Sequence, residues 1–292
     1  MGAFLGSAAK LSQQRLRGRR YVRLSRDLYA VRGDELDLRA RTEAARLVFP
    51  DGVPCLRTAA LLQNLPVDDD GRIHLARGAK AARSERADVK IHRLPVEEDE
   101  LLDLDGLGVA DGPRTFVDLA ASLSFEALVA VGDVVLRRYD EEALQVAVAR
   151  RRKRPGLPLA RRALPLLDAG SESPAETRAR LRLHAAGFLG LQHGVVIRDD
   201  AGEWLAEPDL ADEAARVAVQ YDGWVHMVGD DKPRRRRKEV QRDEVTRQAD
   251  WDVVVATALD DARPDLLVAK VTAAYLRAAR LWGPQVLPPH LR

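Results

Sequence analysis

Acidic and amide side chains in the C-terminal half of the chain have spacings that could hold a metal ion. Asp209 lies at the end of the hydrophobic segment Trp204 to Leu210, and Gln220 and Asp222 are two residues apart in the segment Val217 to Asp222. Side chains alternate between the two faces of a strand, so Gln220 and Asp222 would point the same way. Pairing of the two segments would bring Asp209 beside them. Because carboxylate and amide oxygens suit hard cations, the pattern predicts a site for Mg²⁺ or Mn²⁺.

The segments around these residues alternate between helical and strand patterns. The predicted order is helix Pro174–Ala186, strands Val195–Arg198, Trp204–Leu210 and Arg216–Tyr221, helix Glu239–Gln248, strand Trp251–Ala256 and helix Asp265–Trp282. Ser173, with Pro174 after it and Glu176 three residues later, is a capping signature for the first helix. The α-β-β-β-α-β order is typical of restriction-endonuclease-like domains, in which the last strand enters by a helical crossover.

Proline, glycine and polar turns divide the chain into three parts. Residues 1–70 predict a small two-stranded element and two helices, and residues 71–170 predict short strands followed by a bridge of helices. The stretch from Asp168 to Pro174 marks the boundary before residues 171–292. The expected fold class is therefore multidomain α/β, with an α/β/α core and a mixed sheet in the C-terminal part.

Composition indicates a soluble intracellular protein. Of the 292 residues, 46% are hydrophobic and 32% are charged, which is enough to fill cores and to solvate every surface. The single cysteine, Cys55, has no partner for an internal disulfide. No hydrophobic run approaches the roughly 18–20 residues that span a bilayer, and Met1 to Leu5 lacks the pattern of a signal peptide. We expect a cytoplasmic protein with no membrane partner.

Four basic clusters suggest a polyanionic partner, of which nucleic acid is the first choice. They are Arg15 to Arg23, Arg150 to Arg154, Arg161-Arg162 and Arg234 to Lys238, within a chain whose formal net charge is only +2. The alternative for any single cluster is that the arginines solvate a helix surface.

Five separated motifs in the C-terminal part occur in the order of a known family. They are Ser173-Pro174-Ala175-Glu176-Thr177-Arg178, Asp209-Leu210-Ala211, Val219-Gln220-Tyr221-Asp222-Gly223 with His226, Arg242-Asp243 with Arg247, and Trp251-Asp252-Val253-Val254. From about Ser171 onward the chain resembles the very-short-patch-repair-like endonuclease domain of actinobacterial proteins, a member of the PD-(D/E)XK nuclease superfamily. The resemblance implies a restriction-endonuclease-like core, Mg²⁺-dependent hydrolysis of phosphodiester bonds, and DNA as the substrate.

Motifs in the front half are similar to the winged-helix antitoxins of the AbiEi type. They are Arg15-Leu16-Arg17-Gly18, Leu28-Tyr29-Ala30-Val31, Arg57-Thr58-Ala59-Ala60-Leu61-Leu62 and Pro113-Arg114-Thr115-Phe116-Val117-Asp118-Leu119-Ala120. This similarity implies a module that positions the protein on DNA. The chain before Arg15 is shorter than a complete helix-turn-helix. The similarity therefore does not by itself imply that this half reads a DNA sequence.

The resemblance also implies roles for individual residues. Asp209, Asp222 and Glu176 would hold the cation that activates the attacking water, and His226 would relay a proton. Contacts with DNA phosphates would come from Arg234, Arg235, Arg236, Arg237, Lys238, Arg242 and Arg247. Each role has a structural alternative: Glu176 caps a helix, Asp222 ends a strand at a turn, and His226 is solvated. The helical arginines would then be a salt-bridged surface.

One position departs from the family pattern. Gln220 stands where the family has glutamate, so the second acidic position is neutral. A glutamine oxygen carries no charge and should bind Mg²⁺ less well, although Asp222 on the same face could supply a carboxylate. Two hypotheses follow: a DNA endonuclease of weakened activity, or a DNA-binding regulator of antitoxin type with an inactive nuclease domain. A nuclease that acts on RNA is a third interpretation, because nothing in the sequence separates the two nucleic acids.

Overall fold

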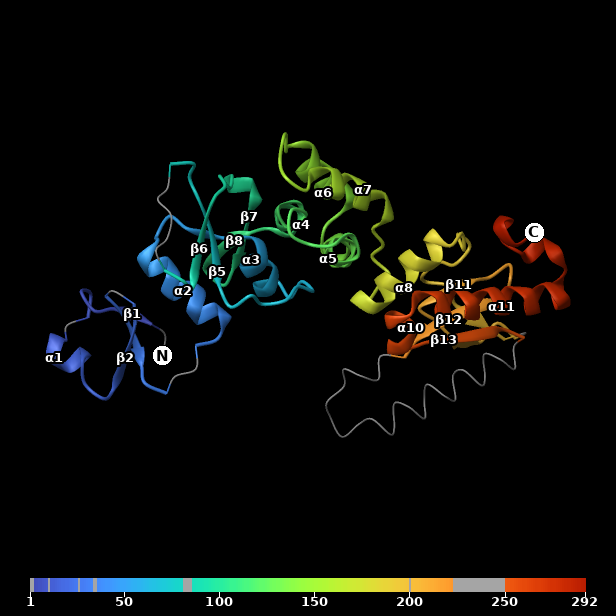
Figure 1. Ribbon diagram of the computed structural model, residues 1–292, viewed down its shortest axis with the longest axis horizontal. Helices are drawn as coiled ribbons and strands as arrows, with labels where there is room; N and C mark the ends of the chain where they lie inside the picture. The colour runs from blue at the N-terminus through green and yellow to red at the C-terminus, as the bar shows by residue number, and fades with distance from the viewer. Residues whose placement is uncertain are drawn as a thin grey trace. The chain divides into compact units, whose positions relative to one another are not determined.

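Helices and short strands alternate along the described chain, and the strands form several small sheets (Figure 1). The structure, a computed structural model, describes residues 3–9, 11–25, 27–33, 36–80, 86–199, 201–222 and 250–292. The chain divides into two compact units, Met1–Pro165 and Leu166–Arg292. The expected multidomain α/β class is confirmed. No helix in the described ranges combines the length and the apolar character needed to cross a bilayer.

The N-terminal unit begins with a three-stranded antiparallel sheet in the order β1-β3-β2. Its elements are β1 (Phe4–Leu5), the short helix α1 (Gln13–Leu16), β2 (Tyr21–Ser25) and β3 (Leu28–Val31). The predicted two-stranded element is present, and β1 adds a strand to it. The ring of Phe4 lies edge-on to Tyr21 at 5.5 Å and stacks on Tyr29 at 6.2 Å between centroids, so aromatic contacts hold β1 to the hairpin.

A second small sheet follows, in the order β4-β5-β6, with its two longer strands parallel. The elements of this region are α2 (Leu38–Val48), β4 (Val53–Pro54), α3 (Leu56–Leu62), β5 (Ile73–Arg77) and β6 (Val89–Arg93). Ala45 of α2 packs with Ile73, Leu75 and Val89 in a buried cluster. This apolar contact joins the helix to the sheet.

A hairpin and a group of helices complete the N-terminal unit. They are the 3₁₀ turn Glu98–Glu100, β7 (Leu101–Leu104), β8 (Leu107–Ala110), α4 (Gly112–Leu119), α5 (Phe125–Arg138), α6 (Glu141–Ala149), α7 (Leu157–Ala163) and the 3₁₀ turn Leu164–Leu166 that runs on into the second unit. Asp111 caps α4 by accepting a hydrogen bond of 2.7 Å from Arg114 N, and Pro113 lies in the first turn, where a missing amide hydrogen costs little.

The C-terminal unit places a three-stranded mixed sheet at its centre. Its elements are α8 (Pro174–Ala185), β9 (Ile197–Arg198), β10 (Trp204–Ala206), β11 (Leu210–Asp212), β12 (Val217–Tyr221), β13 (Asp252–Ala256), α10 (Ala258–Ala262), α11 (Pro264–Trp282) and the 3₁₀ turns Pro284–Val286 and Pro289–Leu291. In the order β11-β12-β13, the first pair is antiparallel and the second is parallel. The predicted helix Glu239–Gln248 lies outside the described residues.

The single predicted strand Trp204–Leu210 is wrong. The structure has two short strands there, in different sheets: β10 pairs with β9, and β11 pairs with β12. Pro208 lies between them and has no amide hydrogen for a ladder, which explains why the strand pairing is interrupted at this point. Asp209 therefore precedes a strand rather than ending one.

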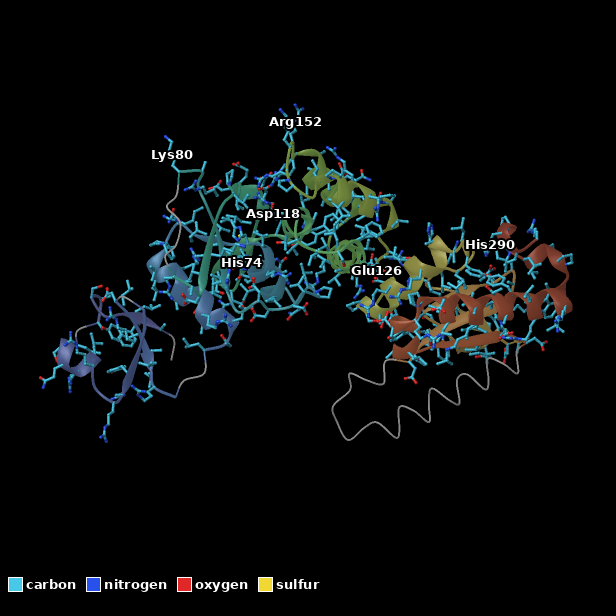
Figure 2. The ribbon with its side chains drawn as sticks, in the orientation of Figure 1. His74, Lys80, Asp118, Glu126, Arg152 and His290 are labelled. Atoms are coloured by element: carbon cyan, nitrogen blue, oxygen red, sulfur yellow. The ribbon has the colours of Figure 1, made fainter. Side chains whose placement is uncertain are left out.

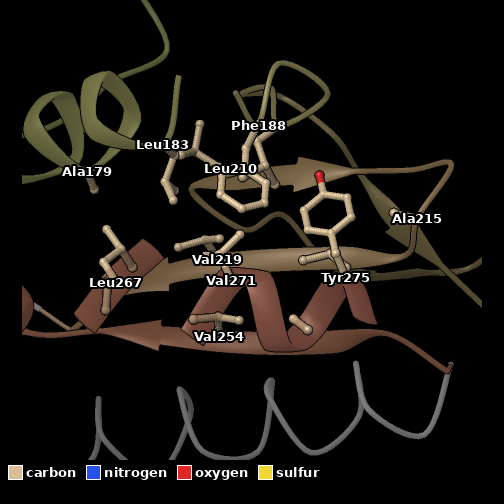
Figure 3. Close-up of a cluster of buried hydrophobic side chains, with 14 of the residues drawn as sticks. Ala179, Leu183, Phe188, Leu210, Ala215, Val219, Val254, Leu267, Val271 and Tyr275 are labelled. Atoms are coloured by element: carbon tan, nitrogen blue, oxygen red, sulfur yellow. The ribbon is translucent and has the colours of Figure 1, made fainter. Parts of the chain in front are cut away.

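The apolar face of the central sheet packs against α8 and α11 (Figure 3). Leu183 of α8, Val271 of α11, and Leu210, Val219 and Val254 of the three strands belong to one buried cluster. A second cluster on the other face joins residues of the central sheet to β9 and β10, and consists of Ile197, Ala206, Ala211, Ala218 and Trp251. Because both faces are covered, polar side chains of β12 can reach solvent only near the end of the strand.

Candidate functional site

The carboxylate of Asp209 lies beside Gln220 at the end of β12. Leu210 pairs with Val219 in the antiparallel ladder, so the residue before Leu210 falls opposite the residue after Val219. Asp209 Oδ1 accepts a hydrogen bond of 2.9 Å from Gln220 Nε2, and Asp209 Oδ2 accepts one of 2.5 Å from Tyr221 N. The predicted neighbourhood of Asp209 and Gln220 is confirmed by these contacts.

The orientation of the Gln220 amide follows from its neighbour. A carboxylate only accepts hydrogen bonds, so the NH₂ end of the amide faces Asp209 and the carbonyl end faces away. Gln220 thus acts on Asp209 as a donor. Both side chains are half-buried, where a hydrogen bond to a charged group is stronger than on an open surface.

Asp222 follows the last residue of β12. Its backbone N–H donates to Ala256 O at 2.7 Å, so the pairing with β13 continues one residue past Tyr221. Alternation along β12 puts Asp222 on the face of Gln220 and Ala218, opposite the face that packs on the helices. The strand therefore delivers two polar side chains to the same face, as the sequence predicts.

Both carboxylate oxygens of Glu176 accept hydrogen bonds at the start of α8. Its Oε1 accepts a hydrogen bond of 2.8 Å from Ser173 Oγ, and its Oε2 accepts one of 2.6 Å from Glu172 N. Ser173 Oγ in turn accepts from Glu176 N at 3.2 Å. The predicted capping interaction is confirmed, and it uses both carboxylate oxygens of Glu176.

The donor set around Asp209 does not fit a Mg²⁺ ion in this arrangement. Mg²⁺ takes oxygen ligands in near-octahedral geometry, whereas Gln220 presents its nitrogen toward Asp209. Across the described ranges, no group of three or more His, Cys, Asp or Glu side chains is placed to hold a metal ion. Neither Glu176 nor Asp222 joins Asp209 in such a group. Cation binding by these residues would need the Gln220 amide to turn over.

The remaining predicted site residues lie outside the described residues. They are His226, Arg234, Arg235, Arg236, Arg237, Lys238, Arg242 and Arg247. Their proposed roles as proton relay and phosphate contacts stay predictions.

Two arginines to which the sequence analysis assigned no role lie near the same end of β12. Arg178 and Arg182, one turn apart on α8, both donate to Asp261 of α10, with contacts of 2.9 Å from Arg178 Nε and 2.8 Å from Arg182 Nη1. Burial raises the pKa of Tyr221, and the nearby charge of Asp261 raises it further. The spacing of four residues indicates that the two arginines share one face of a helix, but their partner Asp261 is remote in sequence, so the sequence does not reveal the ion pairs.

The basic cluster Arg150 to Arg154 is partly engaged in ion pairs within its own unit. Arg150 lies 2.6 Å from Asp99, and Arg151 bonds to Glu100. Arg152 is exposed, and its side chain extends away from the fold (Figure 2). The solvated-surface interpretation therefore accounts for part of this cluster.

Similar proteins exist in Mycobacterium tuberculosis. The uncharacterized protein MT2308 of strain CDC 1551 / Oshkosh and the uncharacterized protein Rv2248 of strain ATCC 25618 / H37Rv are each 29% identical to the chain over 270 residues. The aligned region covers 90% of this chain and 94% of each relative, so the similarity runs through both units. No family model matches the chain.

Proposed function

We propose that the chain is a DNA-binding protein whose C-terminal unit has the core of a PD-(D/E)XK nuclease but does not cleave DNA efficiently. The observation that carries the proposal is the hydrogen bond from Gln220 Nε2 to Asp209 Oδ1. Two carboxylates at these positions would repel each other and favour a bound cation. The glutamine amide instead stabilises Asp209 by direct donation, which removes the electrostatic need for a metal ion.

The order of elements in the C-terminal unit supports a nuclease-type core. A helix, α8, precedes the antiparallel pair β11–β12, and β13 then joins β12 in parallel. Parallel neighbours need a crossover connection, as the predicted topology requires. Asp209, Gln220 and Asp222 lie toward one end of this sheet, at the positions where the family resemblance puts its site residues.

DNA is the proposed partner because of the resemblance and the basic clusters. Lys and Arg side chains bind the phosphate backbone without regard to sequence, and such binding weakens steeply as salt rises. The predicted contacts are the seven basic residues between Arg234 and Arg247.

The second candidate is a Mg²⁺-dependent endonuclease of low activity. The observation that favours it is the shared face of Gln220 and Asp222, with Asp209 in contact with Gln220. One substitution, Gln220→Glu, would give this end of the sheet three carboxylates. A weakened but intact site should therefore gain activity from that change.

Plasmid cleavage and gel shift together test both candidates. The native protein, Gln220→Glu and Asp209→Ala would be incubated with supercoiled plasmid in Mg²⁺, Mn²⁺ or EDTA, and with a labelled duplex for gel shift. Gln192→Glu is the matched control, because it adds the same charge to an exposed position of the same unit. We expect the native protein to shift the duplex without cutting the plasmid.

The outcomes separate the candidates. Metal-dependent nicking by the native protein, lost in Asp209→Ala and in EDTA, would establish the endonuclease and refute the non-cleaving protein. Cleavage by Gln220→Glu alone would support a nuclease core that Gln220 has silenced. Absence of any shift for the native protein at low salt would refute DNA binding and with it the primary proposal.

A further inference from the structure

A cavity of about 470 Å³ lies beside the small sheet β1-β3-β2, far along the chain from the Asp209–Gln220 pair. Its volume falls within the roughly 300–1,000 Å³ that is usual for small-molecule sites. Three arginines and two tyrosines contribute most of the polar lining, together with one aspartate. They are Arg17, Arg23, Arg32, Tyr21, Tyr29 and Asp27.

The lining is strongly basic. Three arginines against one aspartate leave it a formal charge of +2. Asp27 directs its carboxylate to Ser7, whose N donates at 2.8 Å and whose Oγ also donates to it. Within the described part of the chain, no hydrogen bond or ion pair engages the side chain of Arg17, which is exposed at the rim. An anion entering the cavity would meet a cation whose hydrogen-bond donors are available.

A second guanidinium is held in place by the backbone. Arg32 Nε donates to Arg19 O at 2.9 Å, and Arg32 Nη2 donates to Tyr21 O at 3.3 Å. These bonds fix the orientation of Arg32 through neutral carbonyl groups, so its positive charge is not cancelled by them. A preorganised guanidinium loses little conformational entropy when it binds an anion.

The floor of the cavity is tightly packed. Tyr29 is 6% exposed, and Leu16 of α1 is 3% exposed. Gly6 packs against two of the lining residues, because a Cβ there would lie 2.6 Å from Tyr29 Cε2 and 2.9 Å from Asp27 Oδ1. Leu16 and Tyr29 are therefore held by packing within the fold, and the polar lining residues stand around them.

We propose that this cavity binds the phosphate group of a nucleotide, with Arg17 and Arg32 as the phosphate ligands and the hydroxyl of Tyr21 as a further donor. Guanidinium groups match phosphate oxygens in charge and geometry, and a phenol adds a neutral hydrogen bond. The phosphate could belong to a free mononucleotide or to a nucleic-acid strand. This site does not rest on the proposed function of the C-terminal unit.

Calorimetric titration of the full-length protein tests the site. The probes are adenosine 5′-monophosphate, adenosine, and a short single-stranded oligodeoxynucleotide with either a 5′-phosphate or a 5′-hydroxyl. The variant is Arg17→Gln, and Arg15→Gln is its matched control, because Arg15 is an exposed member of the same basic cluster that does not line the cavity. Circular dichroism would check that both variants keep the native fold.

We expect Arg17→Gln to weaken binding of a phosphate-bearing probe about tenfold, the effect of losing one charged hydrogen bond, and Arg15→Gln to change it less than twofold. Binding of the mononucleotide but not adenosine supports a free nucleotide as ligand. Binding of only the oligonucleotides supports a nucleic-acid phosphate, with the 5′-phosphate distinguishing an end from the backbone. Equal loss in both variants, equal binding of adenosine, or no binding of any phosphate probe would overturn the proposal.

Discussion

The two units place carboxylates among hydrogen-bond donors in different ways. In the N-terminal unit, Arg114 has a side chain only 1% exposed and lies 2.5 Å from Glu100 and 2.6 Å from Asp118. Arg151 also bonds to Glu100, so two guanidinium groups meet two carboxylates (Figure 2 labels Asp118). In the C-terminal unit, Asp209 accepts hydrogen bonds from the neutral amide of Gln220 and from a backbone N–H.

The cluster around Arg114 is structural, whereas the Asp209–Gln220 pair is a site whose charge a single substitution can change. The two arginines and two carboxylates of this cluster balance in formal charge, and the side chains of Arg114, Glu100 and Asp118 are no more than 5% exposed, so the cluster holds α4 to the 3₁₀ turn before β7. Gln220 contributes a hydrogen bond but no charge, and its pair with Asp209 is half-buried. Changing one residue there alters the charge balance without removing a buried counter-ion.

Arg114→Met should have the largest effect, because it leaves Glu100 and Asp118 with an uncompensated buried charge. We expect the N-terminal unit to lose about 3–5 kcal/mol of unfolding free energy at pH 7. All four tryptophans lie in the C-terminal unit, so the loss should appear in circular dichroism as a transition that tryptophan fluorescence does not follow. Arg152→Gln, at an exposed position of the same unit, should be neutral. A loss below about 1 kcal/mol would mean that the cluster is not held by Arg114.

The loss of unfolding free energy in Arg114→Met should be smaller in acid than at pH 7. Burial opposes the charge of Glu100, but the hydrogen bonds from Arg151 and from the backbone of Glu97, together with the charges of Arg114 and Arg151, hold the pKa of Glu100 below its usual value. A lowered carboxyl pKa stabilises the fold above the unfolded pKa and loses that contribution as pH falls through the folded pKa. A protonated carboxyl needs no counter-ion, so the difference between native and Arg114→Met proteins should shrink as pH falls through the lowered pKa of Glu100.

Asp111→Asn should stabilise the N-terminal unit. Burial raises the pKa of Asp111 from 3.8 to about 6, so its contribution is favourable below pH 3.8 and is lost as pH rises through 6. Asparagine is as good an N-cap and stays neutral. A shift of this size corresponds to about 3 kcal/mol, of which about 1 kcal/mol is offset by the lost attraction to the helix dipole.

Urea unfolding at two pH values checks this expectation. The variant should exceed the native protein by about 2 kcal/mol at pH 7.5, with the difference falling toward zero below pH 4. Equal stability at both pH values would show that Asp111 is ionised without penalty.

The local features of the fold were readable from the sequence. The capping interaction of Ser173 and Glu176, the hairpin Tyr21 to Val31, and the meeting of Asp209 and Gln220 depend on neighbouring residues or on strand alternation, and the structure contains all three. Such features are set by interactions whose spacing the sequence displays directly.

The features that the sequence did not yield depend on distant partners. The Arg114–Glu100 pair joins a helix to a 3₁₀ turn earlier in the chain, and nothing local marks it. Pro208 splits the expected strand, but only pairing with two different sheets shows that the halves are separate. The direction of the Gln220 amide likewise follows from its contact with Asp209, which sequence alone does not display.

Gln220→Glu should destabilise the C-terminal unit by about 1–2 kcal/mol at pH 7 in EDTA, because a hydrogen bond is lost and two carboxylates face each other. Adding Mg²⁺ should restore stability to the variant by binding its folded state, while the native protein should respond little. Tryptophan fluorescence during urea unfolding follows this unit selectively. Gln192→Glu should show neither effect. An equal Mg²⁺ response in native and Gln220→Glu proteins would contradict the contrast drawn between the two units.

The smallest expected effect concerns whether Glu176 belongs to the helix cap or to a site beside Asp209. A double-mutant cycle of Ser173→Ala and Glu176→Ala, measured by fluorescence-detected urea unfolding, isolates the interaction between the two side chains. Because Ser173 Oγ donates to Glu176 Oε1 at 2.8 Å and accepts from Glu176 N, we expect a coupling of about 0.5–1 kcal/mol that is the same in EDTA and in Mg²⁺. A coupling that falls when Mg²⁺ is added would show that the cation draws Glu176 away from the cap. Glu176 would then bind the cation together with Asp209. The C-terminal unit, like the N-terminal one, would in that case use its carboxylates to face a positive charge.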